Sequence, residues 1–111
     1  IMIDEREFQK QCEAVFESLQ KRLLDVGDER GFEVEGGSGK IEILFDDADE
    51  TRFVISPNSP VRQIWISALT TSFKLGWSEQ ASAFVLEKTG ETLDQVMSRI
   101  LSQQLGAPVT V

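Results

Sequence analysis

The sequence has 111 residues, of which 41% are apolar and 27% charged, a composition typical of one globular domain. Its 19 acidic and 11 basic residues give a net charge of −8, which disfavours binding to nucleic acids because their phosphates are also negative. Without histidine the chain cannot form a Ser-His-Asp triad or a histidine-ligated zinc or haem site. The single cysteine excludes an internal disulfide, and no apolar run is long enough to span a membrane, so we expect a cytoplasmic protein.

The acidic residues are concentrated in the first half of the chain. Residues 1–50 carry 15 acidic and 6 basic residues, whereas residues 51–111 carry 4 and 5. A strongly acidic surface is therefore expected to come from the first half.

Residues 4–26 have the periodicity of an amphipathic helix. Asp4 is a suitable N-cap with Glu7 three residues later, as in a capping box, and Gly27 is placed to end the helix. The apolar positions form one stripe: Phe8, Cys12, Val15, Phe16, Leu19, Leu23 and Val26.

The middle of the chain alternates apolar and polar residues, which predicts strands. The glycine-rich turn at 36–39 and the other short connections favour an antiparallel meander. The expected strands are residues 32–35, 40–45, 52–55, 62–67, 73–77 and 83–86.

Residues 92–105 predict a second amphipathic helix. It opens with a capping box from Thr92 to Gln95, and Gly106 ends it. Each helix has a single apolar stripe to bury, so both are expected on the same face of the sheet. The predicted fold class is α+β: a two-layer α/β sandwich, with the N- and C-terminal helices packed on one face of an antiparallel sheet of about six strands. We expect residues 1–111 to form a single domain.

The strand at 62–67 predicts what the uncovered face of the sheet displays. If Ile64 and Ile66 face the helices, then Gln63 and Trp65 point outward. The same alternation places three carboxylates outward: Glu33, Glu35 and Glu42. A tryptophan on an open sheet face is typical of a protein-binding hot spot, and the alternative is a tryptophan that is covered by a loop or simply exposed.

Residues 53–67, FVISPNSPVRQIWIS, resemble the central signature of the frataxin family. Pro60, Gln63, Ile64 and Trp65 match that signature, and Arg62 is a similar base. The Gly-Ser-Gly turn at 37–39, Trp77, and the Thr-Gly-Glu-Thr run at 89–92 extend the resemblance over nearly the whole chain. The resemblance implies a frataxin-like protein and agrees with the predicted fold.

Members of the frataxin family bind iron weakly through surface carboxylates and modulate iron–sulfur cluster assembly by contacting the cysteine desulfurase and scaffold complex. The resemblance therefore implies iron (Fe2+ or Fe3+) as ligand, the desulfurase and scaffold as partners, and a monomer that delivers or senses iron. The implied metal ligands are Glu17, Asp25, Asp28, Glu29 and Glu33. The expected partner-binding residues are Trp65, Gln63, Asn58, Arg62 and Glu35.

The resemblance does not make this chain an enzyme. A ferroxidase reaction has some support in the family, but nothing in the sequence supplies a buried redox metal site.

In the frataxin family an acidic ridge runs along the outer face of the first helix onto the first strand, and the resemblance implies the same ridge here. It is interrupted in this chain at positions where family members usually carry more acids. This chain has Lys21, Arg22 and Leu24 there, and Lys21 is one helical turn from both Glu17 and Asp25, so it can pair with either. A solvated helix face is the alternative to a metal site. The alternative function is a metal-independent acidic interaction module, similar to a secretion chaperone and dimeric.

Three other features have ordinary structural interpretations. The acidic cluster at 46–50 is expected to be a solvated connection, because it lacks the glycine and distal glutamate of a calcium loop. Cys12 lies in the helix stripe and is expected to be a buried small hydrophobe. The glycines at 36–39 lack the spacing of a phosphate-binding loop.

Overall fold

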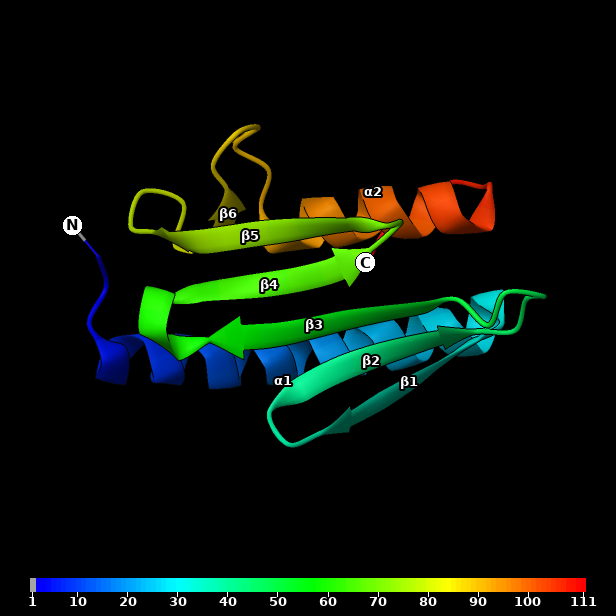
Figure 1. The fold of residues 1–111 in the computed structure, drawn as a ribbon, viewed down its shortest axis with the longest axis horizontal. Coiled ribbons are helices and arrows are strands. Elements are labelled where there is room, and N and C mark those ends of the chain that lie inside the picture. Colours follow the sequence, from blue (N-terminus) through cyan, green and yellow to red (C-terminus); the bar gives the residue numbers. More distant parts are fainter. Residues whose placement is uncertain (1) are drawn as a thin grey trace.

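The computed structural model describes residues 2–111, which form two helices and six strands. Each strand pairs antiparallel with its neighbour in sequence, in the order β1-β2-β3-β4-β5-β6. Both helices lie on one side of the sheet, so the predicted two-layer α/β sandwich is confirmed (Figure 1). The elements are α1 (Glu5–Arg30), β1 (Phe32–Gly37), β2 (Lys40–Phe45), β3 (Arg52–Asn58), the 3-10 turn η1 (Ser59–Val61), β4 (Gln63–Ala68), β5 (Thr71–Ser78), β6 (Ala83–Leu86) and α2 (Leu93–Leu105).

The prediction that Gly27 ends the first helix is wrong. The helix continues to Arg30, and Gly31 caps it in the left-handed conformation at φ 91°. Gly27 is buried against Phe32: a Cβ atom at this position would lie 2.6 Å from the Phe32 carbonyl oxygen. Glycine is therefore needed here for the close approach of α1 to β1. The predicted N-cap is confirmed, since the Asp4 carboxylate accepts from the Glu7 amide at 2.8 Å.

Four strands differ from their predicted bounds. β1 includes Gly36 and Gly37, which were expected to belong to the turn, and β4 lies one residue later than predicted. β3 continues through Pro57 to Asn58, although Ser56 and Pro57 were expected to stop it. The pairing of β2 with β3 ends at Ile41 and Ile55, so at Pro57 the strand has a neighbour only in β4, and a missing N–H can be tolerated on the other side. β4 and β5 meet at a tight turn whose two central residues, Leu69 and Thr70, have φ values of 53° and 58°. That turn has no glycine to mark it in the sequence, so the sequence pattern did not predict its position. β5 begins at Thr71, two residues before its predicted start.

The core lies between the sheet and the two helices. Ile64 and Ile66 of β4 are 0% and 1% exposed, as expected for the covered face of the sheet. The α2 capping box is present in both directions between Thr92 and Gln95. The buried helix residues include Phe8, Cys12, Leu19 and Leu23 of α1 and Val96, Met97, Ile100 and Leu101 of α2. Within residues 2–111, no helix covers the other face of the sheet (Figure 1).

Candidate functional site

Trp65 lies on the open face of the sheet, as its position between Ile64 and Ile66 predicted. The indole is half-buried, and its Nε1 donates to the Gln63 Oε1 at 2.8 Å. Lys74, its cross-strand partner on β5, places Nζ 4.7 Å from the indole centroid. These two contacts fix the orientation of the ring, so its free edge and face are presented in a defined geometry.

The structure brings together only part of the predicted partner-binding set. Asn58 on β3 is the register partner of Gln63 on β4, and Trp65 follows two residues later. Arg62 has a left-handed backbone, at φ 53°, and its Nη1 donates to the Ser59 carbonyl oxygen of η1, so its side chain folds back onto that turn. Glu35 lies on β1, at the far edge of the sheet from Trp65.

Sequence reasoning missed Lys74 as a member of this site. The alternation of β5 is a usable signal, because Leu75 is buried and Lys74 must then point outward. Two further bases, Lys40 and Arg52, lie on the open face and pair with Glu42 at 3.2 and 3.7 Å.

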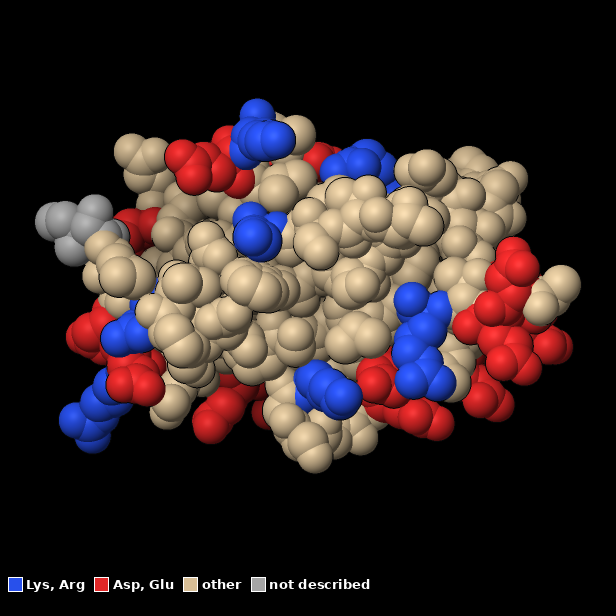
Figure 2. Space-filling model, viewed as in Figure 1, with Lys and Arg blue, Asp and Glu red and all other residues tan. Residues whose placement is uncertain are grey.

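The open face is therefore less acidic than the net charge of the chain suggests. Figure 2 views this face and shows a broad surface without charge at its centre, basic side chains on and beside it, and acidic side chains toward its margins. A partner docking on Trp65 would meet neutral and basic groups first.

The predicted metal ligands all have exposed side chains along α1 and β1. Glu17 pairs with Lys21 at 3.4 Å, with both side chains more than 70% exposed, as the spacing predicted. Arg22 pairs instead with Asp94 of α2 at 3.1 Å. The remaining predicted ligands are Asp25, Asp28, Glu29 and Glu33. Among residues 2–111, no three carboxylates or thiols lie close enough together to hold a metal ion.

Two of these carboxylates share a groove with the acidic cluster at residues 46–50. Asp28 and Glu33 line a groove of about 770 Å³ at the end of α1, together with Asp46, Asp47 and Glu50 from the connection between β2 and β3. Separate stretches of sequence thus meet at one end of the molecule, whereas Glu17 lies farther along α1.

Asp47 has a structural role in that connection. Its carboxylate accepts from the Thr51 amide at 2.8 Å and from the Gln104 Nε2 at 3.1 Å. The hydrogen bonds from Thr51, followed by that from Gln104, hold the pKa of Asp47 below its usual range. The Asp47 carboxylate therefore joins the connection to α2.

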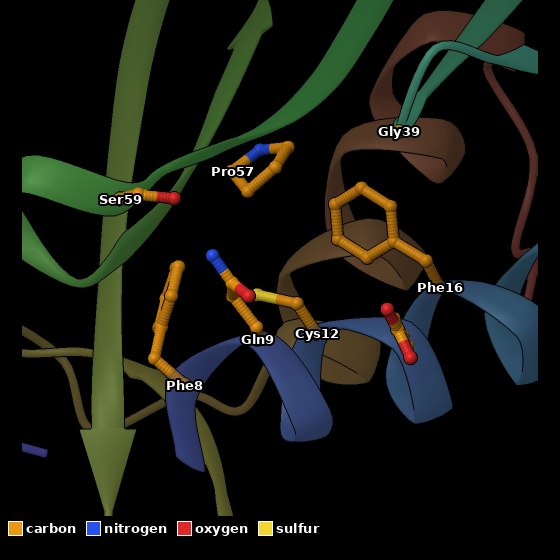
Figure 3. Close-up of a pocket in the computed structure, with 8 residues that line it drawn as sticks. Phe8, Gln9, Cys12, Phe16, Gly39, Pro57 and Ser59 are labelled. Carbon is orange, nitrogen blue, oxygen red and sulfur yellow. The ribbon is translucent and has the colours of Figure 1, made fainter. Parts of the chain in front are cut away.

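Cys12 lies beside an apolar pocket of about 370 Å³ between α1 and the end of β3. Figure 3 shows Phe8, Cys12 and Phe16 on the side of α1 that faces Pro57 and Ser59. The cysteine is 7% exposed, as its place in the stripe predicted. Burial raises the pKa of its thiol to about 12, so the thiol is protonated at neutral pH and is a poor nucleophile or metal ligand.

In the part of the chain that the structure describes, neither helix is both long enough and apolar enough to cross a membrane.

Comparison with known proteins finds relatives that are named for iron–sulfur cluster assembly. It is 28% identical over 92 residues to the iron–sulfur cluster assembly protein CyaY of Pseudomonas fluorescens strain Pf0-1, which covers 81% of this chain and 82% of that protein. It is 22% identical over 94 residues to the protein of the same name from Azotobacter vinelandii, over 83% of this chain and 84% of that protein.

A solved structure of frataxin from Psychromonas ingrahamii has the same fold. It superimposes with a TM-score of 0.77 over 97% of each chain, at 14% sequence identity. The family model described as the frataxin-like domain matches residues 1–107. The resemblance seen in residues 53–67 is thus confirmed, and this chain belongs to the frataxin-like domain family.

Proposed function

We propose that this protein acts in iron–sulfur cluster assembly, as a non-enzymatic monomer that contacts the cysteine desulfurase and its scaffold and binds iron weakly. The names of its relatives support the role in cluster assembly. One observation supports the contact with the desulfurase and scaffold: Gln63 and Lys74 hold Trp65 in one orientation on an uncovered sheet face. We further propose that residues 1–111 act as one domain in the cytoplasm.

The Trp65 surface is suited to binding a protein. An aromatic side chain that is already oriented loses little conformational entropy when a partner covers it. Gln63 contacts the indole, and its register partner Asn58 lies next to it on β3, so both offer amide groups for hydrogen bonds at the rim. Trp65 would then be the energetic centre of the contact.

The carboxylates of α1 and β1 suit weak and reversible iron binding. Iron accepts carboxylate oxygens, and the acids Asp25, Asp28, Glu29 and Glu33 raise the local concentration of any cation. Because no three donors converge among the described residues, each bound ion would keep several water molecules and exchange quickly. Such binding supports sensing or delivery rather than storage.

A reconstituted assembly reaction tests the proposal. The rate of cluster formation by a desulfurase and scaffold is measured with and without the protein, with and without Fe(II). We expect the protein to change the rate and Trp65→Ala to lose most of that change. Leu44→Ala, another apolar truncation on the open face, is the matched control and should behave like the unchanged protein. An identical rate in every condition would contradict the proposal.

An NMR titration tests the iron part separately. Fe(II) should broaden or shift the amide signals around Glu17, Asp25, Asp28 and Glu33, and added salt should weaken the effect because the binding is electrostatic. Changes confined to residues 46–50, or no changes, would show that these carboxylates do not bind iron.

A further inference from the structure

The two edge strands of the sheet, β6 and β1, differ in how their outer backbone groups are paired. At one edge, the four-residue strand β6 is covered: Val85 forms a bridge with Thr92, and the Leu86 amide donates to the Glu91 carbonyl oxygen at 2.8 Å. At the other edge, the six-residue strand β1 pairs only with β2. Within residues 2–111, no backbone hydrogen bond from outside the sheet ladder reaches β1. The outer edge of β1 is therefore free.

The geometry of the hairpin between β1 and β2 determines which backbone groups face that edge. Ser38 and Gly39 form a two-residue turn with φ values of 54° and 78°, and Gly37 and Lys40 flank it as a register pair. In such a turn the flanking pair exchanges hydrogen bonds, so the N–H and C=O groups of alternate residues of β1 point away from β2. Those residues are Phe32, Val34 and Gly36. Since α1 approaches the Phe32 carbonyl at Gly27, the backbone positions left at the edge are Val34 and Gly36, and the Gln20 side chain of α1 covers the helix-side face of Gly36.

Both carboxylate and apolar side chains lie near this edge. On the open face of the sheet, Glu33 and Glu35 are exposed. A groove of about 240 Å³ runs between α1 and β1, and its lining combines apolar Leu24, Phe32 and Val34 with the carboxylates of Asp28, Glu33 and Glu35. Leu24 is 42% exposed, which is unusual for a leucine and leaves an apolar surface beside the free edge.

We propose that the free edge of β1 binds an extended, basic segment of a partner protein by strand addition. The segment would pair its backbone with Val34 and Gly36 and place Lys or Arg side chains beside Glu33 and Glu35. Because side chains of a strand alternate, its intervening residues would be apolar and would fill the groove at Leu24. The inference rests on the proposed function only in assigning the segment to an assembly partner.

Charge selects this occupant over a second copy of the chain. Two β1 edges paired with each other would bring the Glu33 and Glu35 carboxylates of both copies together, and like charges across strands are destabilising. Asp25, Asp28 and Glu29 on the adjacent turns of α1 add to the negative field. The same charges attract a cationic strand.

The test uses the full chain and a blocked peptide of alternating Lys or Arg and Val or Leu, followed by NMR. We expect binding that slows the amide hydrogen exchange of Val34 and Gly36 at least tenfold. A peptide of the same sequence, N-methylated at the residues that would pair with β1, keeps its charge but loses the backbone hydrogen bonds. It should bind about tenfold more weakly or worse.

Variants test the contribution of charge. Glu33→Gln combined with Glu35→Gln should weaken peptide binding about threefold to tenfold, since each exposed pair contributes modestly. Glu13→Gln combined with Asp49→Asn removes the same charge away from the edge and should weaken binding less than twofold. Equal affinity of the plain and N-methylated peptides, protection of amides elsewhere, or self-association through β1 would each overturn strand addition. The assay contains neither iron nor desulfurase, so its failure is distinguishable from failure of the proposed function.

Discussion

The two tryptophans show how a single residue type takes two roles through its position in a strand. Trp65 is on the open face, in contact with Gln63 and Lys74. Trp77 is on the helix side, where it lies opposite Phe84 with ring centroids 5.2 Å apart. The role of each ring follows from which face of the sheet its strand position occupies.

Alanine substitutions should separate these roles. Trp77→Ala leaves space beside Phe84 and should lower the free energy of unfolding by about 2–4 kcal/mol. Trp65→Ala should cost less than about 1 kcal/mol, yet weaken binding to the assembly complex tenfold or more. Urea denaturation and a binding titration measure the two quantities. A large loss of stability for Trp65→Ala would indicate a structural tryptophan instead.

Cys12 should be unreactive in the folded protein. Its ordinary pKa of 9.0 is raised to about 12 by burial, so iodoacetamide at pH 8 should modify it far more slowly in buffer than in denaturing urea. The neutral thiol is favoured in the folded state. Its contribution to stability is therefore fully present below about pH 9 and is lost as the pH rises toward 12. Cys12→Ala should remove that part of the pH dependence, and rapid modification of the folded protein would contradict the prediction.

At the level of whole elements, the position of α1 depends on two glycines with different functions. Gly31 ends the helix because it adopts the left-handed conformation. Gly27 lies inside the helix and permits contact with Phe32. This contact positions β1 beside the second half of α1, and with it the groove at Leu24.

Gly27→Ala should therefore destabilise the protein although alanine favours helices. The added Cβ would lie 2.6 Å from the Phe32 carbonyl oxygen and 3.0 Å from its ring, so the helix or strand must shift. We expect a loss of about 1–3 kcal/mol in thermal or urea unfolding. Gly76→Ala is the control, since its Cβ would have nothing within 4 Å, and it should change stability by less than about 0.5 kcal/mol. Equal stability of the two variants would show that α1 is free to move away from β1.

Across the whole molecule, acidic groups outnumber basic groups along α1 and at the β1 edge, and the open sheet face carries both. The acids gather along α1, at the β1 edge and in the connection after β2, while Lys40, Arg52 and Lys74 lie on the open sheet face. The bases of the open face are partly neutralised there, because Lys40 and Arg52 both pair with Glu42.

The protein should be monomeric. Its net charge of −8 and the carboxylates at the free edge oppose association of copies. Light scattering should give the mass of one chain, 12.4 kDa, at both low and physiological salt. A dimer mass would favour the alternative of a metal-independent interaction module.

Local patterns in the sequence predicted both helices, all six strands and the outward direction of Trp65. They could do so because the periods of 3.6 and 2 depend only on which side of each element meets water. The family resemblance supplied the functional expectation, and the family model confirms the resemblance over residues 1–107.

The tertiary structure decided the features that join separate elements. The contact of Gly27 with Phe32, the placement of Lys74 beside Trp65 and the groove shared by Asp28 and Asp46 depend on strand register and on how α1 packs. It likewise decided that no three of the predicted iron ligands come together among the described residues. The sequence determined which residues reach the surface, because burial follows local periodicity. Only the packing of distant segments determined which of them meet.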